Sequence, residues 1–89
     1  MKFEFDPAKS AATKADRGID FIEAQALWAG ETLAVPLPHA SEPRSAVIGM
    51  VGSKHWTAII TRRGNAVRII SVRRARDKEI QAYEERQET

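Results

Sequence analysis

The sequence contains no cysteine, which excludes a disulfide framework and a thiolate metal site. It also lacks an apolar run long enough to cross a membrane. Its first residues, MKFEFDPAK, lack the apolar segment of a secretory signal peptide. Because the absence of cysteine suits a reducing compartment, we expect a soluble protein of the cytoplasm with no membrane partner.

Internal repeats and low-complexity segments are absent as well. A chain of 89 residues buries only about 60–65% of its unfolded surface, so we expect residues 1–89 to form a single domain with one core. Histidine is scarce: His39 lies in a proline-rich segment and His55 at a hairpin turn. Neither has a carboxylate at ligand spacing, and we therefore expect no metal site and no cofactor.

Positive charge is concentrated in the middle of the chain. Residues 44–78 contain nine Lys or Arg and one acid, a net charge of +8, whereas residues 1–43 and 79–89 each carry −3. Such a localised field attracts polyanions, and the planar fork of arginine suits phosphate. The alternative is a solvated charged surface. Arginine placed within a hydrophobic strand favours phosphate binding over that alternative.

The N-terminal pattern predicts a short strand and then a helix. Phe3 and Phe5 alternate with charged residues, as in a strand with one buried face. Asp6 and Pro7 suit the N-cap and the first position of a helix. This helix is expected to end just before Gly18, which can adopt the left-handed C-terminal conformation.

A second helix is predicted to start directly afterwards. Asp20 and Glu23 have the spacing of a capping box, and Gly30 is a plausible stop. The apolar face of this helix, which we expect in the core, comprises Phe21, Ala24, Leu27 and Trp28.

The rest of the chain alternates like strands until its last segment. A strand at 32–35 and a proline-rich loop at 36–43 are followed by β-branched-rich runs at residues 44–51, 56–61 and 66–72. Turns at Gly52 and Gly64 separate these runs, which is typical of an antiparallel meander. The segment 76–87 has helical spacing. The order predicts an α+β fold whose helices cover one face of an antiparallel sheet.

Several segments, in this order and spacing, resemble the BrnT family of small toxin ribonucleases. They are FEFDPAK, IDFIEA, the run with Glu42, Arg44, Ile48 and Gly49, and RIISVRRA followed by ExxxY. The resemblance spans roughly residues 3–83. It implies a RelE-like fold, metal-free RNA cleavage and neutralisation by a BrnA-like antitoxin. It also implies that DNA is contacted only indirectly, through the antitoxin.

The chain departs from the family at the end of the first helix. The family usually carries Asn-x-x-Lys-His-Gly there, and this chain has Thr13, Asp16 and Arg17 at the Asn, Lys and His positions. Arginine cannot replace histidine as a proton acceptor because it stays protonated, although Arg17 can bind phosphate. This departure leaves three alternatives for the activity of the chain: catalysis is altered, weakened or absent.

Metal-free RNA cleavage needs a base, an acid and positive charge for the crowded phosphorane. We expect Arg73 to hold the scissile phosphate, helped by Arg68 or Arg17. Pairing with the acidic helices is an equal alternative for each arginine. Strand alternation predicts that Arg73 lies on the face opposite Arg68 and Arg74.

Glu79 and Tyr83 lie at i, i+4 on the last predicted helix and share a face, with Glu79 the candidate base and Tyr83 the candidate acid. Their alternatives are a salt bridge from Glu79 to Arg76 or Arg73, and core packing of Tyr83. Lys9 is a second candidate base, with solvent exposure as its alternative. The further RNA-binding candidates are Lys9, Arg44, Arg62, Arg63, Arg74, Arg76 and Lys78.

These features predict an endoribonuclease that inhibits translation and is held in check by an antitoxin. The runner-up is a catalytically weakened or inactive homologue that only binds RNA or its antitoxin. A basic DNA-binding domain is a third possibility, but no helix-turn-helix signal is visible and the arginines lie on strands. Trp56 can stack on a base, with a core position as its alternative.

Overall fold

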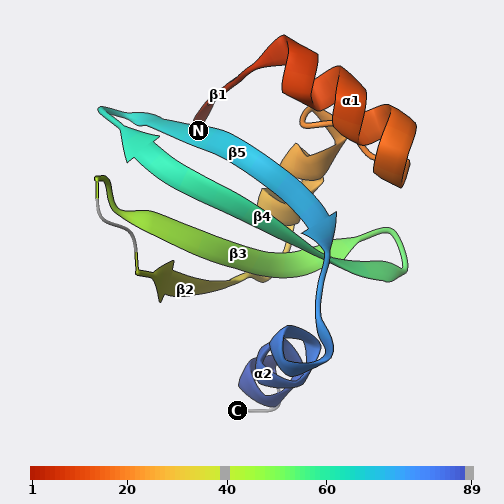
Figure 1. The fold of residues 1–89 in the computed structure, drawn as a ribbon. Helices are drawn as coiled ribbons and strands as arrows, with labels where there is room; N and C mark the ends of the chain where they lie inside the picture. The colour runs from red at the N-terminus through yellow and green to blue at the C-terminus, as the bar shows by residue number, and fades with distance from the viewer. Residues whose placement is uncertain (39–40, 88–89) are drawn as a thin grey trace.

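The computed structural model describes residues 1–38 and 41–87. Five strands of this part form one sheet with the order β1-β5-β4-β3-β2 (Figure 1). The strands are β1 (Lys2–Phe5), β2 (Leu33–Leu37), β3 (Arg44–Val51), β4 (Lys54–Arg63) and β5 (Ala66–Arg74). The helices are α1 (Pro7–Arg17), the 3-10 helix η1 (Glu23–Ala29) and α2 (Asp77–Gln87). The predicted α+β fold is confirmed.

The sheet consists of an antiparallel meander with one parallel strand added. β2, β3, β4 and β5 pair antiparallel in chain order. Gly52 and Gly64, with φ of 62° and 59°, occupy the tight turns on either side of β4, where the left-handed backbone conformation would be strained for a residue with a side chain. β1 pairs in parallel with β5 at the edge opposite β2, and the sequence pattern did not predict this pairing.

β2 continues two residues beyond its predicted end, through Pro36 to Leu37. The predicted loop is therefore wrong at these two positions. A proline is tolerated here because β2 is an edge strand, where a missing N–H group does not interrupt a central ladder. His39, predicted in the same loop, lies outside the described residues.

Helix α1 begins and ends as its sequence predicts. Asp6 Oδ1 accepts a hydrogen bond from the Ala8 N–H at 2.9 Å, with Pro7 as the first helical residue. Gly18 ends the helix in the left-handed conformation, with φ of 81°, and its N–H donates to the Lys14 carbonyl. Both ends depend on residues adjacent in sequence, which is why the pattern was readable.

The second predicted helix has its capping box but a tighter winding. The Glu23 N–H donates to Asp20 Oδ1 at 2.6 Å, and the Asp20 N–H donates to Glu23 Oε1 at 3.0 Å. The helix that follows, η1, is a 3-10 helix. Lys14 Nζ lies 2.8 Å from Glu23 Oε1, and this contact lowers the pKa of Glu23 and raises that of Lys14.

The hydrophobic core lies between the sheet and the α1–η1 segment. Strand residues Val47, Ala58 and Val72 pack there against Phe21 and Leu27. Aromatic edge contacts extend the core toward β1, with ring centroids 5.0 Å apart for Phe3 and Trp28 and 6.0 Å apart for Phe5 and Phe21. Trp28 is partly buried against this core and Trp56 is buried within it.

Helix α2 lies on the other face of the sheet (Figure 1). Val47 points into the core, whereas its neighbours Ala46 and Ile48 line a groove with Glu79 and Ala82 of α2. The prediction that the helices cover one face is therefore wrong, because side chains alternate along β3 and both of its faces are apolar. No helix among residues 1–38 and 41–87 is long and apolar enough to cross a membrane.

Candidate functional site

A β-bulge in β5 decides where its arginines point. Thr61 of β4 pairs with Arg68 and Thr57 pairs with Arg73, so five residue steps on β5 match four on β4. The register shifts between Ile59 and Ile60, which leaves one extra residue on β5. A bulge of this kind changes the alternation beyond it. Arg68 and Arg73 therefore share one face of the sheet, and the prediction that they lie on opposite faces is wrong.

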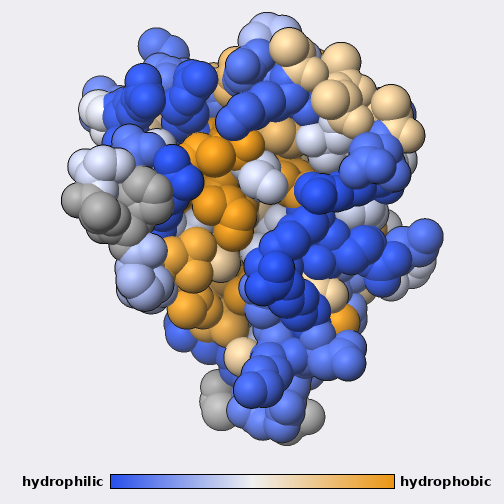
Figure 2. All heavy atoms as spheres, viewed as in Figure 1, coloured by the Kyte–Doolittle hydropathy of each residue, from blue (hydrophilic) through white to orange (hydrophobic). Residues whose placement is uncertain are grey.

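The face that Arg68 and Arg73 share, here called the α2 face, combines basic and apolar side chains. The pairing register places Ile59, which is partly exposed, and Ala46, which is buried, between the arginine positions of this face, and these two residues define its apolar strip. Figure 2 shows an apolar area on the visible face with hydrophilic side chains on both sides of it. The α2 face therefore offers cations at two ends of an apolar strip.

Arg73 and Glu79 form the strongest ion pair on the α2 face. Arg73 Nη1 and Nη2 donate to the two Glu79 oxygens at 2.7 and 2.9 Å, and both side chains are about one-fifth exposed. Glu79 also accepts from the Thr57 hydroxyl at 3.1 Å and from the Arg76 N–H at 2.8 Å. The Arg73 guanidinium, followed by the Arg76 N–H, lowers the pKa of Glu79 to about 2. Glu79 raises the pKa of Arg73 in turn.

Tyr83 and His55 hold the next turn of α2 against the sheet. The Tyr83 hydroxyl donates to the Glu31 carbonyl at 3.1 Å, and the residue is only 6% exposed. Its ring meets the His55 ring edge-on, with centroids 5.6 Å apart. His55 Nε2 lies 3.0 Å from Glu84 Oε1. Sequence reasoning missed this His55–Glu84 pair, because its members are far apart in the chain.

Four predicted RNA-binding or catalytic cations meet in one cavity. Its volume is about 150 Å³, and its lining residues are Asp6, Lys9, Glu42, Arg44, Arg63, Arg68, Ile69 and Ile70. The cations come from four different elements: α1, β3, β4 and β5. We call this site the four-cation cavity. It lies where β1 gives way to α1, beside the Arg68 end of the bulge.

Arg17 and Arg74 lie away from the four-cation cavity. Arg17 Nη1 donates to the Val72 carbonyl at 2.7 Å, which fixes the end of α1 to β5. Arg74 pairs with Trp56 across the strands and its guanidinium carbon lies 5.4 Å from the Trp56 ring centroid. Trp56 is buried, which is the alternative that its sequence position left open. The group that stacks on its ring in this structure is the Arg74 guanidinium.

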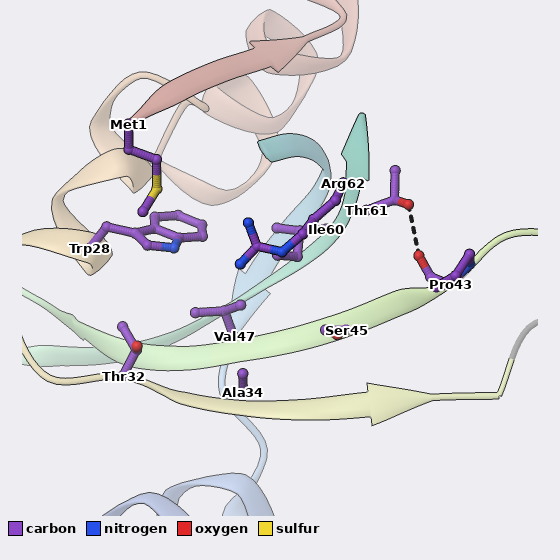
Figure 3. A pocket seen from close by; sticks show the side chains of 10 residues that line it. All are labelled: Met1, Trp28, Thr32, Ala34, Pro43, Ser45, Val47, Ile60, Thr61 and Arg62. Atoms are coloured by element: carbon purple, nitrogen blue, oxygen red, sulfur yellow. Dashed lines mark hydrogen bonds between the residues drawn. The ribbon is translucent and has the colours of Figure 1, made fainter. Parts of the chain in front are cut away.

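Arg62 lies in a separate pocket of about 480 Å³ on the opposite face from Arg63. Figure 3 shows the Arg62 side chain extending toward Trp28 and Met1, with Val47 below it. The walls are largely apolar, which distinguishes this pocket from the four-cation cavity. Of the two remaining candidates, Arg76 is exposed at the start of α2 and Lys78 lines the groove under that helix.

The described residues include no group of three or more His, Asp or Glu side chains arranged to hold a metal ion.

No curated protein matches the sequence. Residues 5–79 match the family described as "Ribonuclease toxin, BrnT, of type II toxin-antitoxin system". This match covers α1, η1, all of β2 to β5 and the first turn of α2, including the bulge and the arginines of the α2 face. The chain belongs to the BrnT family of ribonuclease toxins.

Proposed function

We propose that this protein cleaves RNA without a metal ion, that cleavage inhibits translation, and that a BrnA-like antitoxin neutralises it. The observation that carries the proposal is the α2 face, where the bulge brings Arg68 and Arg73 to one side of the sheet with the apolar strip of Ile59 and Ala46 between them. Single-stranded RNA offers phosphates to arginines and unstacked bases to apolar side chains. Its expected site of action is the cytoplasm, where translated RNA lies.

Arg73 is the proposed ligand of the scissile phosphate. Its guanidinium already forms two parallel hydrogen bonds to a carboxylate, a geometry that two phosphate oxygens reproduce. When phosphate binds Arg73, at least one of the two hydrogen bonds from Arg73 to Glu79 must be replaced by a hydrogen bond to a phosphate oxygen. We propose that Glu79 orients Arg73 until RNA arrives. Arg17 is bonded instead to the carbonyl of Val72, the residue directly before Arg73 in β5.

Proton transfer is better supplied by His55 than by Glu79 or Tyr83. A carboxylate whose pKa is about 2 is a weak base at neutral pH, and both Glu79 oxygens already accept hydrogen bonds. The Tyr83 hydroxyl is committed to the Glu31 carbonyl. His55 remains one-fifth exposed on the α2 face, with Glu84 orienting Nε2. We propose that His55 supplies the acid–base group that family members carry at the position of Arg17.

Purified protein incubated with single-stranded RNA in excess chelator tests cleavage. We expect cutting by the parent, and at least a tenfold lower rate for Arg73→Gln and for His55→Gln. Lys54→Gln is the matched control, because it removes one charge from an exposed side chain of β4 that belongs to none of these contacts. RNA left intact by the folded, antitoxin-free parent contradicts the proposal.

A homologue that binds RNA without cutting it is the second candidate function. Its specific support is Arg17, which occupies the histidine position of the family. The Arg17 guanidinium donates a hydrogen bond to the Val72 backbone carbonyl. This reading predicts that Arg17→His causes growth arrest on expression while the parent does not. Equal arrest by both proteins contradicts it.

A BrnA-like antitoxin is proposed as the partner on electrostatic grounds. An acidic segment laid on the α2 face would neutralise Arg68 and Arg73 and accelerate association. Co-expression should therefore relieve toxicity, and the association rate should fall as salt is raised. DNA binding is proposed to need the antitoxin, so the toxin alone should show no preference for its own promoter over unrelated duplex DNA. A sequence preference of the isolated toxin contradicts this part.

A further inference from the structure

The four-cation cavity gathers more positive charge than its own carboxylates can pair. Arg44 Nη2 lies 3.4 Å from Glu42 Oε1, and Arg68 Nη1 lies 3.7 Å from Glu4 Oε1. Both contacts are longer than the 2.7 Å contact of Arg73 with Glu79. The Asp6 carboxylate is used to cap α1 through the Ala8 N–H. Hydrogen-bond donors on the cavity wall are therefore available for an incoming anion.

Several of these donors have no partner among the described residues. Arg44 Nε is buried and has no hydrogen-bond acceptor within the described part of the chain. The Lys9 and Arg63 side chains likewise form no hydrogen bond or ion pair with any residue that the structure describes. A buried donor without an acceptor and like charges held close together are both unfavourable, and a bound anion relieves both.

The size and surroundings of the cavity suit a phosphate group. A cavity volume of about 150 Å³ has room for several water molecules and therefore for the five heavy atoms of a phosphate group. The first turn of α1 adjoins the cavity through Asp6 and Lys9. The partial positive charge of this helix end adds to the field of the cations.

The four-cation cavity is distinct from the contact proposed for the scissile phosphate. Arg68 and Arg73 are opposite Thr61 and Thr57, which are separated by four residue steps of β4, or about 13 Å along a strand. Arg68 points to Glu4 and the cavity, whereas Arg73 points to Glu79 under α2. Between them lie Ile59 and the bulge.

We propose that the four-cation cavity is a second phosphate-binding site, which holds a phosphate of the RNA chain while the chain crosses the apolar strip toward Arg73. This inference rests on the proposed function for the source of the phosphate. The recognised group is either a backbone phosphodiester or a terminal phosphate. Its role is to set which bond of the RNA reaches Arg73.

Binding of a 2′-O-methyl RNA oligonucleotide, which cannot be cleaved through its 2′-oxygen, tests this site by fluorescence anisotropy. We expect Lys9→Gln and Arg63→Gln to weaken binding about tenfold and to reduce the slope of log affinity against log salt by about one. Lys54→Gln is the matched control for Lys9→Gln, since it removes the same charge from an exposed site outside the cavity, and should change affinity less than twofold. Equal losses in all three variants would mean that only overall charge matters, and would overturn the site.

Two further measurements separate the source of the phosphate and keep the outcome independent of catalysis. An affinity gain from a 5′-phosphate that disappears in Arg63→Gln identifies a terminal phosphate. Equal, Arg63-dependent binding with and without the 5′-phosphate identifies the backbone. Inorganic phosphate should raise the melting temperature of the parent, at constant ionic strength, more than that of Arg63→Gln. A protein that cuts RNA but shows no Arg63 dependence refutes this site alone, whereas Arg63-dependent binding without cutting refutes only the proposed function.

Discussion

Replacing Glu79 by Gln should destabilise the protein at neutral pH and much less in acid. The carboxylate accepts two hydrogen bonds from Arg73, one from the Thr57 hydroxyl and one from the Arg76 N–H. A pKa of about 2 instead of 4.5 corresponds to about 3 kcal/mol of preference for the charged form in the folded state. Solvent reaches one-fifth of the side chain and screens part of this interaction, so about 2 kcal/mol is expected in practice.

The sign of the pH dependence follows from the lowered pKa. The unfolded chain takes up the proton near pH 4.5 and the folded chain only near pH 2, so the contribution of Glu79 is complete above pH 4.5. It is lost as pH falls from 4.5 toward 2, and about half of it is gone by pH 3. The stability difference between the parent and Glu79→Gln should therefore shrink over that interval.

Urea denaturation of both proteins at pH 7 and pH 3 measures these differences. Glu85→Gln is the matched control, because Glu85 lies on the same helix and is exposed. Within the described residues, its carboxylate accepts a hydrogen bond only from the Gln81 side-chain amide, at 3.3 Å. It should change stability by less than about 0.5 kcal/mol at either pH. A Glu79→Gln effect below that value at pH 7, or one of equal size at both pH values, would refute the argument.

Three further changes test other parts of the fold by thermal or chemical unfolding. Ser10→Ala removes the buried hydroxyl that accepts from the Phe21 N–H at 2.9 Å, and should cost about 1–3 kcal/mol; a loss under about 0.5 kcal/mol would deny the bond. Tyr83→Phe removes the donor to the Glu31 carbonyl and should cost about 1 kcal/mol, while an unchanged midpoint would contradict it. Deletion of Ile70 should leave a folded protein within about 2 kcal/mol of the parent, because later β5 side chains keep their faces, and a chain unfolded in buffer would disprove the bulge.

Features that depend on neighbours in sequence were predictable. The caps of α1, the capping box at Asp20 and Glu23, and the turn glycines follow from conformational preferences of single residues. The Arg73–Glu79 ion pair was one of two alternatives for Glu79, since six residues separate its members. The winding of η1 was not predictable, because the same capping signal opens both kinds of helix.

Contacts between distant strands were not predictable from one sequence. The Arg68–Glu4 pair needs β1 beside β5, a parallel pairing that alternating hydrophobicity does not specify. The His55–Glu84 pair needs α2 to cross back over the hairpin that begins β4. In each case local residue types were compatible with several partners, and the packing of whole elements selected one.

The bulge shows how the hydrophobic core decides the chemistry of the opposite face. Val67, Ile69 and Val72 are all buried on the core side, at 1%, 1% and 0% exposure. The first two are two residues apart and suit a regular strand, but Ile69 and Val72 are three apart and would face opposite sides. Turning Val72 away from the core would cost about 1.5–3 kcal/mol, whereas one lost ladder bond costs about 0.5–1.5 kcal/mol. Because burial of Val72 contributes more than the lost hydrogen bond costs, β5 accommodates an extra residue. Arg73 consequently lies on the α2 face together with Arg68. The apolar spacing of this strand, rather than its arginines, thus places the candidate RNA-binding groups on one side.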